Sequence, residues 1–578
     1  MNAPGRAVFL LVWLSACAGS EGAPVRPSPL DSLPESLATV PPPSLSISSE
    51  EARQEALLQE PPPLRLRALD REPISNAYAI DDIDNLLFRV QPESVRESVR
   101  AIYVQRGGTF LWSDGLVLTP AAEALLRLIS DLPDHGVRRE LVGAALIENL
   151  AHAAHWISEL LGELPKRAKW GFESFGVRSN LARLRLLLTE ELDIRLTGAA
   201  LALVRLLGLL DVGGDDLAAL LQEDQARLAF VRSLVPHSER YERLVKAHRL
   251  YGAMHDFEDC SGFAGGAKLV VGRRDPRVPC LRRRLEVELD GLSGMRKVPA
   301  WAKDDRSEGD SHDERLAWLL TRFQESRALP PSGDLDEATI AALSVPRRAL
   351  VDQIRTAMRA VRGSGSRGKG TYVLVNIPEF TAELVVDSEV RRRHRVVVGY
   401  SYGTGGGRTK LLTSSIERVV VNPGWTPSDG ILQNELLPKE KADPGYLQRE
   451  GFSRFVRPNG QEGYYQLPGD RNALGRVTLN FENQNFLYLH GTPDETAFGY
   501  VSRALSHGCV RVQDVEAFAL DVLDVAGGMT ATEFERALDS RRKVEVKLER
   551  PVPIAIDYYR VSVADDGLVR FLPNIYRF

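Results

Sequence analysis

The sequence predicts a multidomain α+β protein, in which a helical N-terminal region and a small helical module precede a mostly β C-terminal domain. A chain of 578 residues is too long for a single hydrophobic core. Apolar residues recur at helical spacing from about residue 75 to 343, whereas short β-branched segments bounded by Gly, Pro or Asp follow residue 371. The net charge of −5 gives no electrostatic argument for nucleic acid as a partner.

Residues 1–17 have the features of an export signal. Arg6 is the only charged side chain at the start, and the apolar run of residues 7–14 is too short to span a bilayer as a helix. Leu14-Ser15-Ala16-Cys17 resembles the bacterial lipobox, in which the cysteine becomes the lipidated first residue of the mature protein. An ordinary secretory signal with a chance cysteine is the alternative. We therefore expect an exported, periplasmic protein with a lipid anchor at Cys17, which in a cell with two membranes favours the outer one.

The next two segments differ sharply in composition. Residues 18–74 are rich in Pro, Ser, Glu and Ala, and they cannot bury enough apolar surface to become ordered, so we expect a disordered tether. Residues 75–262 carry leucine stripes at helical spacing, which predicts a helical scaffold domain. Within it, Thr119 and Pro120 have the order of an N-cap followed by a first-turn proline.

The remainder of the chain divides into four parts. Residues 263–346 predict a small module of three helices, and residues 347–370 predict a long helix followed by a glycine-rich linker. Residues 371–548 begin with short strands and form the predicted β domain, and residues 549–578 are a C-terminal extension.

Two of the four cysteines could pair with each other. Cys260 and Cys280 lie 20 residues apart in a chain expected to be exported. They could form a disulfide, or they could remain two unpaired buried thiols. Cys509 has no evident partner. No CxxC motif or second histidine cluster supports a structural metal site.

Two short motifs in the β domain carry the candidate chemistry. In residues 485–492, Phe486, Tyr488 and His490 alternate with two leucines, so a strand would bury the leucines and present His490 at its end. Gly491 then ends the strand. Cys509 follows His490 by 19 residues, in Ser-His-Gly-Cys-Val-Arg, and can return to meet it.

A cysteine beside a histidine favours nucleophilic catalysis. The thiolate is the nucleophile, and an imidazole within reach can take the thiol proton and later deliver it to a leaving amine. Gly508 would let backbone N–H groups approach a developing oxyanion. A helix after Cys509, with Asp514 as its predicted cap, would add a favourable dipole. Purely structural roles are the alternative, and a zinc site of His490, His507 and Cys509 lacks a further ligand at a suitable spacing.

The pattern His-Gly-Thr followed by Ser-His-Gly-Cys-Val-Arg resembles the YkuD-type L,D-transpeptidases, cysteine enzymes that cross-link peptidoglycan. Three further segments and the C-terminus resemble the YcbB-like branch of that family. They are Asn422-Pro423-Gly424-Trp425, Glu435-Leu436-Leu437-Pro438, residues 466–475 and residues 558–576.

The resemblance implies a fold and a function. Residues 263–346 would be a peptidoglycan-binding-like module, and residues 371–548 a catalytic L,D-transpeptidase domain with an inserted capping subdomain at about 428–476. The enzyme would be a cysteine acyltransferase that needs no cofactor or metal. It would form 3→3 cross-links between peptidoglycan stem peptides, and carbapenems would inhibit it covalently. Hydrolysis by an L,D-carboxypeptidase or amidase is the second reading, and a non-catalytic peptidoglycan-binding scaffold is the third.

The resemblance also implies roles for individual residues. Cys509 would be the nucleophile and His490 the general base, with the Gly491 carbonyl orienting its ring. Ser506, His507 and Gly508 would complete the catalytic loop, and Ser506 would also contact the substrate. Arg511 would stabilise the loop or bind a substrate carboxylate. Trp425 and Tyr488 would line the substrate cleft or belong to the core. The chain departs from the branch at Gly491, where aspartate is usual, at Thr409-Lys410, where Thr-Pro is usual, and after Trp425, where Thr-Pro-Ser replaces Val-Pro-Pro. These departures bear on the substrate specificity of the cleft and not on the identity of the nucleophile.

Overall fold

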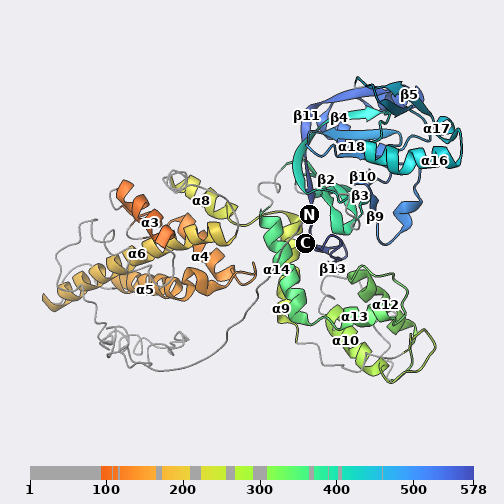
Figure 1. Cartoon of the computed structure of the whole chain (residues 1–578). Coiled ribbons are helices and arrows are strands. Elements are labelled where there is room, and N and C mark those ends of the chain that lie inside the picture. The colour runs from red at the N-terminus through yellow and green to blue at the C-terminus, as the bar shows by residue number, and fades with distance from the viewer. Residues whose placement is uncertain are drawn as a thin grey trace, which may run out of the picture. The chain divides into compact units, whose positions relative to one another are not determined.

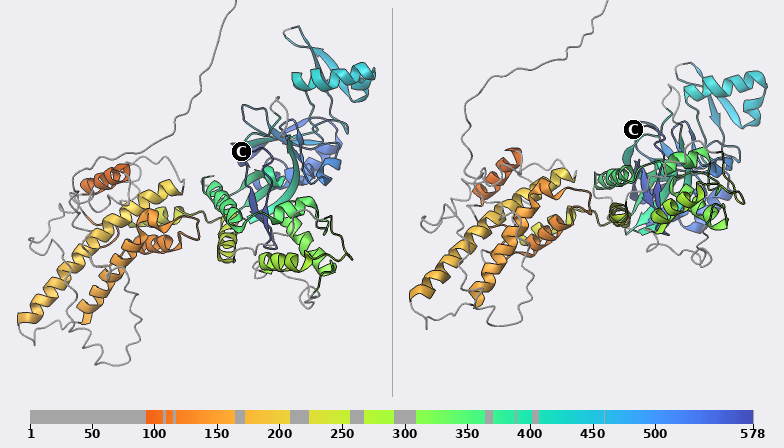
Figure 2. Two further views of the ribbon diagram at one scale, coloured as in Figure 1. Left: turned by 60° about the horizontal axis from the view of Figure 1, so that its bottom comes forward. Right: turned by 90° about the horizontal axis from the view of Figure 1, so that it is seen from below.

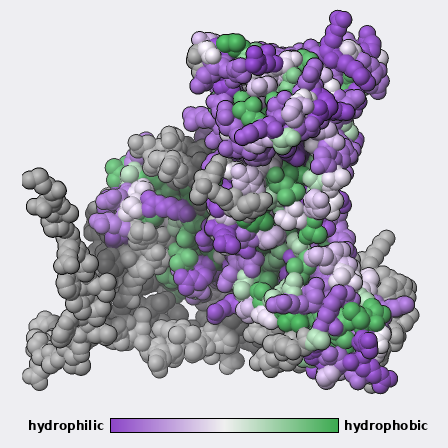
Figure 3. All heavy atoms as spheres, turned by 45° about the vertical axis from the view of Figure 1, so that its right-hand side comes forward, coloured by the Kyte–Doolittle hydropathy of each residue, from purple (hydrophilic) through white to green (hydrophobic). Residues whose placement is uncertain are grey.

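The computed structural model describes residues 93–577 apart from 107–108, 115–116, 164–171, 208–222, 256–266, 291–308, 364–369, 388, 401–406 and 459 (Figure 1). The predicted signal, Cys17 and the tether lie outside the described residues, as does nearly all of the glycine-rich linker. None of the described helices is both long and apolar enough to cross a membrane. On the face drawn in Figure 3, hydrophilic side chains predominate and hydrophobic ones form small groups.

The predicted helical scaffold is present. Its helices are α3 (Glu93–Gln105), α4 (Pro120–Asp131), α5 (Ala144–Glu163), α6 (Phe172–Leu206) and α8 (Asp224–Ser233). The predicted start of α4 is confirmed, because the Thr119 side chain accepts a hydrogen bond from the Ala122 N–H at 3.2 Å. Asp193 is buried inside this core, where it accepts hydrogen bonds from the Leu111 and Trp112 amides at 2.9 and 2.7 Å.

Helix α9 (Glu239–Ala253), which we assigned to the scaffold, belongs to a different core. Its apolar face packs together with α14 (Arg347–Gly363) and the C-terminal segment. Arg362 donates to the Tyr241 hydroxyl at 2.9 Å, and Arg355 donates to His248 at 3.1 Å. The leucine pattern alone could not show which neighbour α9 would bury its face against.

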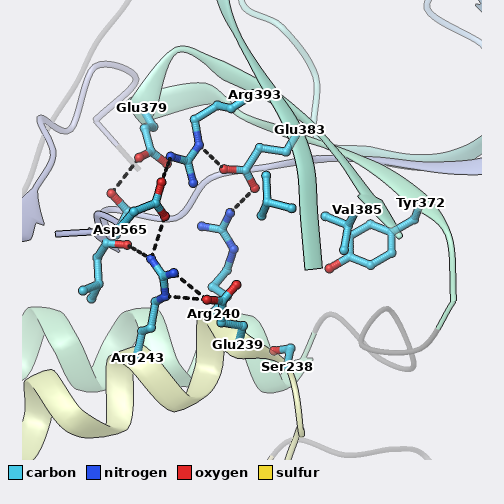
Figure 4. Close-up of a pocket in the computed structure, with 13 residues that line it drawn as sticks. Ser238, Glu239, Arg240, Arg243, Tyr372, Glu379, Glu383, Val385, Arg393 and Asp565 are labelled. Carbon is cyan, nitrogen blue, oxygen red and sulfur yellow. Dashed lines mark hydrogen bonds and ion pairs between the residues drawn. The ribbon is translucent and has the colours of Figure 1, made fainter. Parts of the chain in front are cut away.

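Ion pairs join α9 to the β domain around a small cavity of about 40 Å³ (Figure 4). Glu383 is 1% exposed and accepts hydrogen bonds from Arg240 at 2.5 Å and from Arg393 at 2.7 Å. Arg243 reaches Asp565 in the C-terminal segment at 2.9 Å. Arg240 and Arg393 offset the cost of burying this carboxylate and hold the pKa of Glu383 below its usual value.

The described part of the small module contains the helices α10 (Val278–Asp290), α12 (Glu314–Ser326) and α13 (Glu337–Leu343). Gln324 is fully buried in α12, and its amide donates to the Asp334 carbonyl at 2.8 Å and to Thr339 at 3.0 Å. Cys280 is disulfide-bonded. Cys260 lies outside the described residues, so its pairing with Cys280 stays a prediction, as does the resemblance to a peptidoglycan-binding module.

The β domain is built on a nine-stranded sheet in the order β10-β8-β7-β4-β11-β1-β2-β3-β9. Strand β10 pairs with both β8 and β3, so the sheet closes on itself. The strands are β1 (Tyr372–Asn376), β2 (Thr381–Val386), β3 (Glu389–Gly399), β4 (Leu412–Val421), β7 (Val477–Phe481), β8 (Tyr488–His490), β9 (Ala504–Ser506), β10 (Val510–Val512) and β11 (Val544–Asp557).

Helices α18 (Val515–Ala526) and α19 (Ala531–Asp539) complete the core of this domain. The predicted apolar face of α18 is buried, with Phe518 and Val522 fully inaccessible. The predicted cap is wrong. Asp514 occupies the N-cap position, but its φ of 49° is left-handed and its side chain makes no capping hydrogen bond.

The predicted boundary between residues 548 and 549 is also wrong. Strand β11 runs through it and is an interior strand of the sheet, paired with β1 and β4. The hairpin of β12 (Val561–Val563) and β13 (Val569–Phe571) follows, and Tyr576 returns into the sheet core with no exposed surface. The C-terminal residues are therefore part of the domain.

A compact insertion lies between β4 and β7, in the range predicted for the capping subdomain. It comprises α15 (Asp429–Ile431), the π-helix η6 (Leu432–Leu436), α16 (Leu437–Ala442), α17 (Tyr446–Arg449) and the hairpin of β5 (Phe452–Val456) and β6 (Glu462–Gln466). Leu432, Leu436 and Leu447 form its own small core. Figure 2 shows these elements, in cyan, gathered apart from the sheet.

Candidate active site

The parallel pairing of β8 with β10 brings the two motifs together. Leu489 is in register with Val510, and His490 with Arg511. Leu489 and Val510 are 0% and 1% exposed and belong to the sheet core. Because side chains alternate along a strand, Tyr488 and His490 occupy the opposite face, together with Arg511. The expected burial of the leucines is confirmed.

Phe486 departs from the predicted alternation. Strand β8 begins only at Tyr488, and Phe486 lies in a turn with φ 53° and its side chain 85% exposed. Asn483 shapes this turn, because its side chain donates to the Leu487 carbonyl at 2.8 Å and accepts from the Leu487 amide at 2.9 Å. The turn aims the Phe486 carbonyl at the Cys509 thiol, whose Sγ donates to it at 3.8 Å.

Cys509 is a free, half-buried thiol. Burial raises its pKa above the ordinary value, and hydrogen bonds with the backbone and phenol of Tyr488 oppose the rise, as does the charge of Arg511. Burial and the neighbouring Cys509 thiol raise the pKa of Tyr488, and Trp425 beside its hydroxyl opposes the rise. Of the two residues predicted to line the cleft, Tyr488 thus lies beside the thiol and Trp425 beside Tyr488.

His490 is buried at the end of β8. Its Nδ1 lies 2.6 Å from the Gly491 carbonyl, so Nδ1–H donates there and the lone pair is on Nε2. Burial, followed by the charge of Arg511, lowers the pKa of His490 to about 3. Among the described residues no hydrogen bond joins His490 to Cys509. The resting site therefore holds a neutral thiol and a neutral imidazole, and the Gly491 carbonyl bonds the Nδ1 side of the ring.

Ser506 and Gly508 shape the loop that carries Cys509. The Ser506 hydroxyl accepts from the Gly508 N–H at 3.1 Å and donates to the Cys509 carbonyl at 2.6 Å. Ser506 is 2% exposed, so its hydroxyl is buried and bonds the loop itself instead of facing an open surface. Gly508 has φ 126°, a conformation that side-chain-bearing residues rarely adopt.

Thr409 and Tyr576 support the same loop and were not predicted as site residues. The Thr409 hydroxyl donates to the Gly508 carbonyl at 2.7 Å and accepts from the Gly399 N–H at 2.8 Å. The Tyr576 hydroxyl donates to the Gly399 carbonyl at 2.8 Å and accepts from the Thr409 amide at 3.1 Å. In the sequence, Thr409 stands out only as a departure from the family pattern, and Tyr576 only as part of the C-terminal segment that resembles the family. Neither signal indicates a role in the site.

His507 and Arg511 flank Cys509 on either side. His507 Nε2 lies 2.6 Å from Glu435 Oε1 of the capping subdomain, and the Tyr400 ring meets the imidazole edge-on at 5.5 Å. Arg511 makes no ion pair with any described residue, although Asp494, Cys509 and Glu435 all act on its charge. The described part of the chain contains no group of three or more potential metal ligands.

The fold and the site together define an α+β protein whose closed C-terminal sheet presents a histidine at the end of β8 and a cysteine in the loop just before β10. Residues 370–544 match the family described as the L,D-transpeptidase catalytic domain, YkuD. Residues 97–208 match a family described as a scaffold domain. The chain therefore carries a YkuD-type L,D-transpeptidase catalytic domain, preceded by a helical scaffold domain.

Two individual proteins resemble the chain. A Haemophilus influenzae protein, whose name provisionally makes it an L,D-transpeptidase, is 31% identical over 220 residues, which cover 35% of this chain and 44% of that protein. The match thus spans less than half of that relative's length. A solved L,D-transpeptidase structure from Xylanimonas cellulosilytica is aligned over 51% of this chain and 98% of its own, with 14% identity and a TM-score of 0.17.

Proposed function

We propose that the protein is a peptidoglycan L,D-transpeptidase that forms 3→3 cross-links through a thioester on Cys509. The observation that carries this proposal is the β8–β10 pairing, which puts the free thiol and a neutral buried imidazole in one site. A neutral imidazole can accept the thiol proton, which an imidazolium could not. The YkuD domain supports the substrate class, since L,D-transpeptidases act on peptidoglycan.

The reaction has two halves. The Cys509 sulfur attacks the carbonyl carbon of the third residue, a diamino acid, in a tetrapeptide stem, and His490 Nε2 takes the thiol proton. The C–N bond breaks, the proton goes to the leaving D-Ala amine, and a thioester remains. The side-chain amine of a second stem then attacks the thioester, so that a C–N bond forms as the C–S bond breaks. The broken peptide bond supplies the energy of the new one, and no cofactor is required.

Arg511 and the Trp425–Tyr488 pair take supporting roles in this proposal. Arg511 binds a carboxylate of the donor stem, because its guanidinium is half-buried and has no ion-pair partner among the described residues. Tyr488 donates a hydrogen bond to the sulfur as negative charge develops there, and Trp425 holds the phenol in place.

Water in place of the amine would give an L,D-carboxypeptidase or an amidase that cuts peptidoglycan links. A peptidoglycan-binding scaffold with an inactive site would form no acyl-enzyme. Purified protein incubated with tetrapeptide muropeptides separates the three functions by product mass. We expect dimers; trimmed monomers alone would make the enzyme a hydrolase, and unchanged muropeptides with no protein mass shift would leave only the scaffold.

Export and anchoring are further proposals from residues 1–17. We propose that Cys17 is lipidated and that residues 18–74 tether the enzyme to a membrane, most naturally the outer one. Mass analysis of the N-terminal peptide from the expressed full chain tests this. Diacylglyceryl-modified Cys17 is the expected result, and an unmodified N-terminus beyond Cys17 would contradict it.

A further inference from the structure

Glu435 and His507 form a carboxylate–imidazole pair at the mouth of the site. Glu435 comes from the capping subdomain, and His507 precedes the nucleophile by two residues in the catalytic loop. Their 2.6 Å contact joins Glu435 Oε1 to His507 Nε2. The charge of Glu435 also acts on Arg511, two residues after Cys509. The Glu435 carboxylate therefore contacts a residue that precedes Cys509 and acts through its charge on a residue that follows it.

Glu435 is held in this position by local structure. It lies in the π-helix η6, a rare conformation that is often found at functional sites. Leu432 and Leu436 are 2% and 7% exposed and anchor this turn in the core of the capping subdomain. Between these two anchors the Glu435 side chain is about two-fifths exposed, and it leaves the insertion to reach the catalytic loop.

The pairing determines where a proton can be received. Because Glu435 engages Nε2, the hydrogen of a neutral His507 ring lies on that nitrogen and the lone pair lies on Nδ1. Nδ1 of His507 makes no hydrogen bond with the described residues, and the Tyr400 ring edge limits rotation of the imidazole. This is the arrangement of an oriented base, in which a carboxylate fixes the tautomer and stabilises the imidazolium that forms.

The second half-reaction of the proposed function needs such a base. An acceptor amine reaches the site as an ammonium ion, which has no lone pair and cannot attack the thioester. We propose that His507, positioned by Glu435, takes one proton from the acceptor ammonium and thereby favours an amine over water. The free amine attacks, the C–S bond breaks, and the second nitrogen proton goes to the departing sulfur of Cys509. Glu435 is a positioning residue here, and its charge also attracts the cationic acceptor.

This inference rests on the proposed function, and the test separates the two. Wild type, E435Q, E435D and the control E462Q are first converted to the acyl-enzyme with a tetrapeptide donor. A tripeptide acceptor is then added over a concentration series, and the dimers and trimmed monomers that form are quantified. Glu462 is an exposed carboxylate of the same subdomain that pairs with Arg454 on the β5–β6 hairpin. We expect E435Q to lower the dimer-to-monomer ratio about tenfold or more, while the acylation rate changes less than about threefold. E435D should recover part of the ratio and E462Q should match wild type.

A second acceptor distinguishes proton removal from a merely structural latch. Hydroxylamine is largely uncharged at neutral pH and needs no base, so it should discharge the acyl-enzymes of wild type and E435Q at similar rates. Equal losses of E435Q in acylation, dimer formation and hydroxylamine discharge would mean that the Glu435–His507 pair only holds the loop, and this would overturn the proposal. An unchanged dimer-to-monomer ratio in E435Q would overturn it as well. If wild type itself yields only trimmed monomers, the proposed transpeptidase function fails and the acceptor role falls with it.

Discussion

The Thr409 hydroxyl donates a hydrogen bond of 2.7 Å to the carbonyl of Gly508, the residue immediately before the nucleophile. Thr409 is 1% exposed, so neither its hydroxyl nor the Gly508 carbonyl can find water instead. The position of Cys509 thus depends on a residue that lies a hundred positions earlier in the chain.

Replacing Thr409 with valine keeps the shape and removes the hydrogen bond. The Gly508 carbonyl and the Gly399 N–H lose their partner, and the catalytic loop relaxes. We expect acylation by a carbapenem to slow by about 10- to 100-fold, because small misplacements of reacting groups are costly. Stopped-flow or mass-resolved acylation rates measure this. The control T356V removes a hydroxyl from the exposed side of α14 and should acylate at the wild-type rate.

Tyr576 can be tested against its neighbour Tyr558. Y576F removes the hydroxyl that bridges the Gly399 carbonyl and the Thr409 amide, whereas Y558F removes the hydroxyl that donates to the Asn574 side chain and accepts from the Tyr576 amide. Each variant loses a hydroxyl that bonds the C-terminal segment, so both melting temperatures should fall. Only Y576F should slow acylation, by about tenfold. Equal acylation rates at equal stability would mean that the C-terminal tyrosine does not position the loop.

The pH dependence of acylation follows from the two pKa shifts. The pKa of His490 is lowered to about 3, so the imidazole is an available base throughout the range above pH 4. Burial raises the pKa of Cys509, so the thiolate fraction still increases with pH above neutrality. The acylation rate measured from pH 5 to 9 should rise without an inflection near the ordinary histidine value of about 6.5. Such an inflection would instead indicate a histidine that titrates normally beside the thiol.

Asp193 predicts a pH effect on stability. Burial raises the pKa of this carboxyl to about 6, above the value near 4 expected in the unfolded chain. Between these values the folded state holds the proton more tightly, so stability is lost as pH rises from about 4 to 6 and changes little above that. The loss amounts to about 3 kcal/mol for this one group. The free energy of unfolding of wild type minus that of D193N, measured at several pH values, should therefore fall as the pH rises from about 4 to 6.

Local patterns in the sequence predicted the parts of the site that are close in the chain. The alternation around Leu489 and the glycine after His490 sufficed to place the histidine at a strand end, and the 19-residue return placed Cys509 nearby. The prediction that Phe486 belongs to the strand was wrong, because a turn in which Phe486 has positive φ precedes β8. The turn is held by the hydrogen bonds of Asn483, which the alternation of residue types does not indicate.

Contacts between distant segments could not be predicted. The bond of Tyr576 to Thr409 spans 167 positions, and Glu435 meets His507 from an inserted subdomain. The domain boundary at 548 was wrong because β11 continues past a register shift between Lys547 and Val552 and remains paired with β4 as far as Ile556.

The roles of Cys509 as nucleophile and His490 as its base are tested most directly by the intact mass of wild type, C509A and H490N after exposure to a carbapenem. We expect one carbapenem mass on wild type, none on C509A, and an adduct on H490N that forms at least about 100-fold more slowly. An adduct on C509A at the wild-type rate would show that Cys509 is not the nucleophile.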